Sequence, residues 1–307
     1  MPDFSRLDAV KRQRPLIHCV SNLVSANDCA NLALAIGASP MMAQALPEME
    51  DITTASSATV LNTGTPDEEK FRVCLVCGKA AERLGQPAVL DPVGVGASPW
   101  RLERTFEMLR LFTPAILRVN LGEARALLQL DSREQGVDSP AASSREERLE
   151  IAVRLARHRR TAVLLSGPED IAADGSAAWC VTGGSDLMSK VTGTGCMLSV
   201  LCGVFAAVEP DRLSAAVLAS AFWKVCSHRA ELAAGGKGPG SFRAALMDAA
   251  AGVTSADFAA EAQVDRLLLR GVIHYIISIM RPDCPRAVRF SPAPAYFRLL
   301  PHRLSKR

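Results

Sequence analysis

The sequence predicts an α/β fold in which a mainly parallel central sheet is covered by helices on both faces. Two observations lead to this prediction. Short apolar runs recur along the chain and each ends in a polar residue, as the buried strands of a parallel sheet do. Stretches with helical spacing of apolar residues lie between these runs, and strand–helix–strand alternation is typical of parallel strands.

The predicted strands are the apolar runs Ala58–Asn62, Ala88–Asp91, Ile116–Asn120 and Ala162–Ser166. In open sheets of this kind, ligands bind outside the carboxyl ends of the strands. We therefore expect the four polar residues that end the runs to meet at one rim of the sheet. These residues are Asn62, Asp91, Asn120 and Ser166.

Helices and loops are predicted between the strands. Apolar residues recur at helical spacing over Glu68–Leu84, until Gly85 and Pro87 end the pattern. The segment Gln135–Glu147 is rich in Ser, Pro, Glu and Arg, which predicts a surface loop within the domain.

Composition and charge narrow the class of protein. With 307 residues, 49% of them apolar, the chain can bury a large core as one domain, with or without a terminal extension. The formal net charge is only +3, and no basic run with interleaved aromatic residues argues for nucleic acid. Nine cysteines without regular spacing suit free thiols in a reducing compartment.

The sequence gives no sign of export or of a membrane span. The first fifteen residues are polar and charged, unlike a secretory leader. The longest apolar run follows Met197 and covers about a dozen residues, whereas a membrane helix needs roughly twenty. We expect a soluble, cytoplasmic protein.

The strongest local motif is the glycine-rich segment Val191–Cys196, directly before the apolar stretch Met197–Val208. It predicts a turn that opens a buried helix. Glycines let the backbone approach a ligand closely, and the free amides of a first helical turn attract anions. The motif therefore indicates a cradle for a phosphoryl group.

Cys196 lies at the start of that predicted helix. The field of the helix there favours thiolate over thiol, so Cys196 is a candidate base or polar contact for a substrate hydroxyl. The alternative is a buried structural cysteine. Cys74 and Cys77 have redox-motif spacing, but they lie in a helical apolar stretch without a second pair, which argues against zinc or redox chemistry.

Two carboxylates are candidate magnesium ligands. Asp91 ends a predicted strand and Glu123 lies just beyond another, so both could hold Mg²⁺ directly or through water. Loop capping by Asp91 and helix N-terminal stabilisation by Glu123 are equally open. The glycine fingerprints of P-loop and Rossmann proteins are missing, so phosphate chemistry would need another scaffold.

The chain resembles the hydroxyethylthiazole kinase family, within the ribokinase-like superfamily, over residues 14 to 250. The resemblance consists of several blocks in the same order along the chain. They are His18–Asp28, Gly37–Met42, Leu61–Thr65, Leu90–Gly96, Arg118–Glu123, Ser166–Gly167, Gly193–Cys196 and Gly238–Phe242.

The resemblance implies ATP-dependent phosphorylation of the hydroxyl of 4-methyl-5-(2-hydroxyethyl)thiazole, with Mg²⁺, in thiamine salvage. It implies a ribokinase-like three-layer sandwich and a homotrimer with active sites between subunits. It further implies a thiazole pocket formed by Asn22, Val24, Met42, Gly64 and Gly193. The ATP contacts would be Arg118, Asn120, Ser166, Thr194 and Gly195, with Asp91 and Glu123 at the metal and Cys196 at the reacting hydroxyl.

Some positions depart from the family pattern. Val119 stands where glycine is common, and its β-branched side chain could shift the backbone that presents Arg118. After Thr254 the resemblance fades, which predicts a kinase domain over residues 1–254 and a C-terminal extension of unassigned role over 255–307. The extension could hold a further helix around Leu267–Met280, followed by a dispensable tail.

Two other functions remain open. One is a different ribokinase-like activity, such as a pyrimidine or vitamin B6 kinase or an ATP-dependent dehydratase, and the Asn22–Met42 block argues against it. The other is a catalytically silent protein that binds thiazole or thiamine. The presence of Cys196, Asp91 and Glu123 argues against this second alternative.

Overall fold

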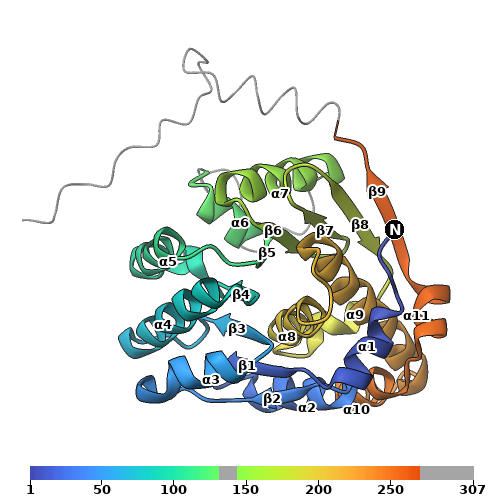
Figure 1. Ribbon diagram of the computed structural model, residues 1–307. Coiled ribbons are helices and arrows are strands. Elements are labelled where there is room, and N and C mark those ends of the chain that lie inside the picture. The colour runs from blue at the N-terminus through green and yellow to red at the C-terminus, as the bar shows by residue number, and fades with distance from the viewer. Residues whose placement is uncertain (131–143, 270–307) are drawn as a thin grey trace, which may run out of the picture. The chain divides into compact units, whose positions relative to one another are not determined.

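A computed structural model describes residues 1–130 and 144–269, and in these ranges the strands form a single sheet (Figure 1). The strand order is β2-β1-β3-β4-β5-β6-β7-β8-β9. The strands are β1 Leu16–Val20, β2 Ser39–Met41, β3 Ala58–Asn62, β4 Ala88–Asp91, β5 Ile116–Asn120, β6 Ala162–Ser166, β7 Asp170–Ala173, β8 Ala178–Thr182 and β9 Gln263–Leu267.

The sheet is parallel from β2 to β6 and antiparallel from there to β9. The prediction of a mainly parallel sheet is therefore confirmed. The four strands predicted from apolar runs are β3, β4, β5 and β6, with the same bounds.

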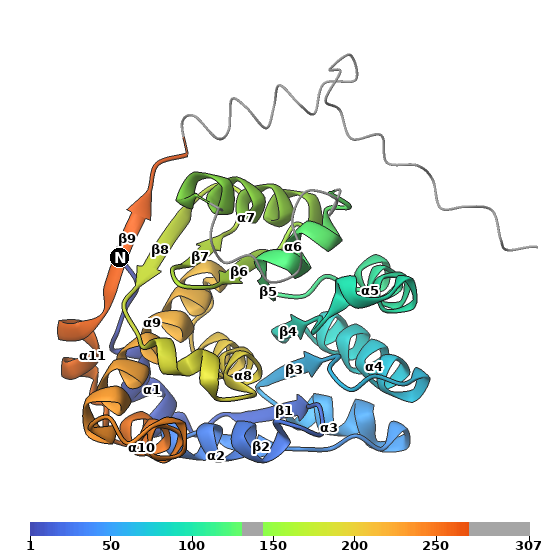
Figure 2. The ribbon, with the colours of Figure 1, turned by 180° about the vertical axis from the view of Figure 1, so that it is seen from behind.

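Helices cover both faces of the sheet (Figures 1 and 2). One layer contains α3 Met49–Ala55, α4 Glu68–Leu84, α5 Pro99–Leu111, α6 Leu121–Leu127 and α7 Arg145–Arg159. The other contains α1 Arg6–Gln13, α2 Ala26–Ile36, α8 Thr194–Ala206, α9 Arg212–Ala234 and α10 Pro239–Gly252. A short helix, α11 Ser255–Glu261, follows α10. The predicted three-layer α/β sandwich is confirmed.

The helix α4 has the predicted bounds and signals at both ends. Asp67 caps it by accepting a hydrogen bond from the backbone amide of Lys70, at 2.7 Å. Gly85 ends it in the left-handed region, with φ 67°. The predicted loop Gln135–Glu147 lies largely outside the described residues, and its last three residues belong to α7.

The helix α8 is enclosed on all sides because it packs on β3 and β4 and is flanked by α2 and α9. Every residue from Met197 to Ala206 is buried. At Gly203 a Cβ would come within 2.6 Å of the Val60 side chain, so the glycine lets α8 pack closely on β3. The sheet therefore fixes the position of α8 through its second half.

The described domain extends beyond the predicted boundary at residue 254. The compact unit ends at Leu269. Phe258 of α11 is fully buried and packs edge-to-face on Phe222, with ring centroids 5.6 Å apart. β9 pairs with β8, which adds backbone hydrogen bonds. Of the further helix expected around Leu267–Met280, Leu267 ends β9 and the part from residue 270 onward lies outside the described residues.

Within residues 1–130 and 144–269, no helix is both long enough and apolar enough to cross a membrane.

Candidate active site

The polar strand ends meet in pairs at one rim of the sheet, as predicted. Asn62 lies opposite Asp91 in the register of β3 and β4, and Asn120 lies opposite Ser166 in that of β5 and β6. Arg118 connects the two pairs. Its guanidinium donates to the Ser166 hydroxyl at 2.7 Å and lies 3.5 Å from an Asp91 oxygen.

Asp91 is fully enclosed in the protein. One of its oxygens accepts from the Asn62 amide and from the Ser199 hydroxyl, each at 2.7 Å, and the other faces Arg118. Burial raises the pKa of Asp91 to about 6, although Arg118 and the Ser199 hydroxyl favour the ionised form. Asn62, Ser199 and Arg118 all direct a donor at this carboxylate, so Asp91 orders the groups around it.

Arg118 lies at the centre of the site. Burial lowers the pKa of Arg118, but the carboxylates of Asp91 and Glu123 raise it by more, so Arg118 stays charged. Gly195 packs directly against the guanidinium. A Cβ at Gly195 would lie 2.7 Å from Nη2 of Arg118, which explains why a residue without a side chain is needed there.

Asn120 and Glu123 form a reciprocal cap at the start of α6. The Asn120 side chain accepts from the Glu123 amide at 2.8 Å, and the Glu123 carboxylate accepts from the Asn120 amide at 2.9 Å. The second Glu123 oxygen accepts from the Gly94 amide at 2.9 Å. Glu123 thus stabilises a helix N-terminus, one of the two roles that the sequence left open.

The glycine-rich turn opens α8 as predicted. Gly193 caps the helix with φ 83°, and a Cβ there would lie 2.9 Å from that of Ser25. Cys196 follows in the first turn and is partly exposed. Its sulfur accepts a hydrogen bond from the Asn22 amide at 3.2 Å. The β1–α2 loop and the glycine turn therefore lie against each other.

These groups open into a pocket of about 340 Å³. The predicted site residues on its wall are Asn22, Val24, Gly64, Arg118, Asn120, Glu123, Gly193, Gly195 and Cys196. Ser25, Thr65, Val93 and Thr192 complete it. One cavity thus brings together the candidate base, the arginine and the amides of a helix N-terminus.

The other predicted site residues do not line this pocket. Asp91 and Ser166 lie behind Arg118, each in contact with it. The Thr194 hydroxyl donates to the Met188 carbonyl at 3.1 Å and so belongs to the turn before α8. Met42 packs against the hydrophobic core.

Ser199 was not predicted as part of the site. It donates to Asp91 from α8, one turn after Cys196. The signal in the sequence is a single serine inside an otherwise apolar helix, since a buried hydroxyl needs a partner.

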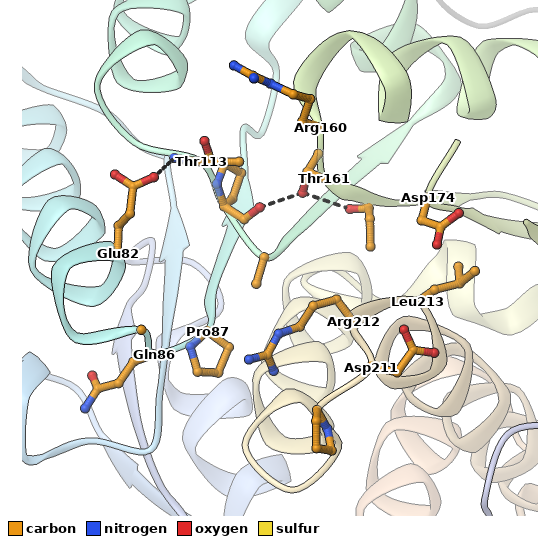
Figure 3. A pocket seen from close by; sticks show the side chains of 15 residues that line it. Glu82, Gln86, Pro87, Thr113, Arg160, Thr161, Asp174, Asp211, Arg212 and Leu213 are labelled. Atoms are coloured by element: carbon orange, nitrogen blue, oxygen red, sulfur yellow. Dashed lines mark hydrogen bonds between the residues drawn. The ribbon is translucent and has the colours of Figure 1, made fainter. Parts of the chain in front are cut away.

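A larger pocket, of about 520 Å³, lies at the amino ends of the strands (Figure 3). Its polar side chains hold local turns together. Glu82 accepts from the Thr113 amide at 3.0 Å, Thr161 donates to the Pro114 carbonyl at 2.6 Å, and Arg212 donates to the Ala206 carbonyl at 2.8 Å. Because ligands of such sheets bind at the carboxyl ends, we assign the site to the smaller pocket.

Comparison with known proteins identifies the family. The sequence pattern of the hydroxyethylthiazole kinase family matches residues 7–256. The chain belongs to this family. A hydroxyethylthiazole kinase from Listeria monocytogenes is 41% identical over 251 residues, which cover 82% of this chain and 93% of that protein. One from Methanocorpusculum labreanum is 38% identical over 258 residues, covering 84% and 96%.

Solved structures agree with the family assignment. The hydroxyethylthiazole kinase protein of Pyrococcus horikoshii has a TM-score of 0.78 at 34% identity, covering 86% of this chain and 98% of that one. A pyridoxal kinase from Staphylococcus aureus, solved with ADP, has a TM-score of 0.54 at 15% identity, covering 70% and 87%. This second likeness concerns the fold alone.

Proposed function

We propose that this chain transfers the γ-phosphoryl group of ATP to the hydroxyl of 4-methyl-5-(2-hydroxyethyl)thiazole. The observation that carries the proposal is the single pocket in which Cys196, Arg118 and the glycine turn of α8 meet. Membership of the hydroxyethylthiazole kinase family over residues 7–256 gives the substrate class.

Phosphoryl transfer asks a protein mainly to position its reactants and to stabilise charge. The free amides at the start of α8 and the Arg118 guanidinium supply positive charge on one side of the pocket. Cys196 lies in the same turn, where it would accept the proton of the substrate hydroxyl. We place the transferring phosphoryl group between these amides and Arg118.

The two substrates would occupy different parts of the pocket. Asn22, Val24, Gly64 and Gly193 would contact the thiazole, and Arg118, Asn120 and Gly195 would contact ATP, with Ser166 acting through Arg118. Thr194 does not line this pocket, so its contact with ATP stays a prediction from the family. Met42 stays a prediction from the family, because it lies away from this pocket within one chain.

Magnesium fits the oxygen donors that are present. Glu123 presents a carboxylate on the pocket wall, and each of its oxygens accepts one backbone amide, which leaves further lone pairs for a metal ion. Asp91 does not line the pocket and is bonded to Asn62 and Ser199. Mg²⁺ usually keeps several waters and binds through one or two carboxylates plus substrate phosphates. We therefore propose that Glu123 holds it, directly or through water, with Asp91 behind. When bound, the ion would neutralise charge on the phosphates.

We propose a homotrimer with active sites at the subunit interfaces. The support is apolar surface next to the pocket, where the Leu23 and Val24 side chains are 81% and 62% exposed. Sedimentation of the purified protein tests this assembly, because a monomer would contradict it.

The described cysteines are free thiols, which supports a reducing compartment such as the cytoplasm.

The deciding experiment measures ADP release by the purified protein with ATP, Mg²⁺ and hydroxyethylthiazole. Hydroxymethylpyrimidine and pyridoxal serve as rival acceptors, and a reaction without acceptor corrects for ATP hydrolysis. We expect turnover that depends on the thiazole. Turnover with a rival alone would assign another kinase activity, and thiazole binding without turnover would assign a sensor.

A further inference from the structure

A continuous chain of hydrogen bonds runs from the buried Asp91 to the thiol of Cys196 through two asparagines. The Asn62 amide donates to Asp91 at 2.7 Å. The Asn22 amide donates to the Asn62 carbonyl oxygen at 3.0 Å and to the Cys196 sulfur at 3.2 Å. Four side chains, from the ends of β3 and β4, the β1–α2 loop and α8, are thus connected in series.

The direction of every bond in this chain is fixed from both ends. A carboxylate only accepts, so Asp91 requires the NH₂ group of Asn62, and the Asn62 oxygen must face away from it. At the other end the Asn22 oxygen accepts from the amides of Val24 and Ser25, each at 3.0 Å. The Asn22 NH₂ group therefore faces Asn62 and Cys196.

The two asparagines are buried and lie directly against the backbone of Gly64. The Asn22 and Asn62 residues are 5% and 3% exposed. Gly64 donates its own amide to the Asn62 oxygen at 2.9 Å. A Cβ at Gly64 would lie 2.8 Å from the Asn22 nitrogen and 2.9 Å from the Asn62 oxygen. Gly64 thus makes the pairing of the two amides possible.

We infer that Asn62 is a positioning residue, which holds the amide nitrogen of Asn22 against the sulfur of Cys196. The oxygen of Asn22 has three donors, from Val24 and Ser25, but its nitrogen has only Asn62 as a strong acceptor, because sulfur accepts weakly. An N–H directed at the sulfur favours negative charge there, so Asn62 sets the nucleophilicity of this thiol. The effect on turnover rests on the proposed function, whereas the effect on the thiol does not.

The test compares the wild-type protein with Asn62→Ala, using iodoacetamide as the probe. The rate of alkylation of Cys196 is followed at about pH 7, below the ordinary pKa of a cysteine thiol, so that the rate depends on the thiolate fraction. Mass spectrometry of the peptide that contains Cys196 measures it. We expect the variant to react roughly fivefold more slowly, as for the loss of one hydrogen bond to a charged acceptor. We also expect kcat to fall by roughly tenfold, while KM for ATP changes much less, because the Ser166 hydroxyl still holds the Arg118 guanidinium.

The matched control is Ser220→Ala, which also removes a neutral donor to a buried aspartate, the bond of Ser220 to Asp170 at 2.8 Å. It should leave the alkylation rate of Cys196 at the wild-type value. If Asn62→Ala does not fold, Asn62→Ser is used in its place. Alkylation of the Asn62 variant at the wild-type rate would overturn the inference. Slower alkylation in a protein that lacks thiazole turnover would support it and overturn the proposed function alone.

Discussion

A change at Cys196 should affect the chemical step without affecting nucleotide binding. Its sulfur contacts Asn22 rather than Arg118, so Cys196→Ala should lower kcat by roughly a hundredfold and leave ADP affinity unchanged. Steady-state kinetics and titration calorimetry with ADP measure the two effects. Cys202→Ala, a change at a buried thiol on the same helix, is the control. Unchanged turnover would remove Cys196 from the mechanism.

Gly195 should matter because of the space it leaves for Arg118. Gly195→Ala would place a methyl group 2.7 Å from the guanidinium and displace it, so we expect KM for ATP to rise by roughly tenfold. Gly240 occupies the same second position of α10, with no atom within 4 Å of an added Cβ. Gly240→Ala should therefore keep the wild-type KM, and equal effects of the two changes would contradict the steric explanation.

His18 should make stability depend on pH. Its Nε2 lies 3.1 Å from the Ala43 carbonyl oxygen and its Nδ1 lies 3.3 Å from the Thr53 hydroxyl. Burial lowers the pKa of His18 below the ordinary 6.5. As pH falls through 6.5, His18 takes up a proton in the unfolded chain but stays neutral in the folded chain. The contribution of neutral His18 to the free energy of unfolding, present above pH 6.5, is therefore lost below it.

Urea unfolding at a series of pH values tests this expectation. The free energy of unfolding should fall less steeply below pH 6.5 in His18→Gln than in the wild type. An equal dependence of stability on pH in the two proteins would mean that His18 has the same pKa in the folded and the unfolded chain, which would contradict this expectation.

Of the four predicted strand ends, Asn120 alone lines the pocket. The glycine turn of α8 was predicted from its motif, and Asn22, Val24 and Gly64 from the family resemblance. The direction of individual side chains could not be predicted. Thr194 turns away because the Met188 carbonyl accepts its hydroxyl, and Ser199 joins the site because Asp91 lies across from it in space. Such contacts join residues far apart in the chain, and no local pattern encodes them.

At the scale of elements, continuous apolar runs with clear ends were predictable, as β3 to β6 and α4 illustrate. The antiparallel strands were not. β7 begins with the buried Asp170, which Ser220 of α9 satisfies, and β9 carries the exposed polar residues Gln263 and Arg266. β7 is buried along its whole length but is only four residues long, and β9 lacks the composition of a buried strand. Pairing with neighbouring strands makes both of them part of the sheet.

The helix α11 should contribute to the stability of the domain through one side chain. Phe258 is fully buried against Phe222 and Phe205, so Phe258→Ala should lower the free energy of unfolding by about 4 kcal/mol. Urea unfolding measures this change. Leu268→Ala, at a side chain that is 83% exposed, is the control and should alter it by less than about 0.5 kcal/mol. Similar effects of both changes would contradict the packing of α11.

For the whole molecule, the end of the domain can be tested by truncation. A chain that stops after Leu269 keeps every described element, so its Tm should equal that of the full chain. A chain that stops after Thr254 loses α11 and β9, which uncovers Phe222 and the edge of β8, and its Tm should fall sharply or the protein should aggregate. A normal Tm for the shorter chain would restore the boundary at residue 254.

The two outer strands of the sheet limit how copies of the molecule can associate. β2 has Pro40 at its centre, which has no N–H to offer an incoming strand, and β9 presents Asp265 and Arg266. Strand addition from a neighbouring molecule is disfavoured at both edges. Association between copies is therefore expected to use helical and loop surfaces. The two edge strands also protect the folded protein against forming an intermolecular β-sheet.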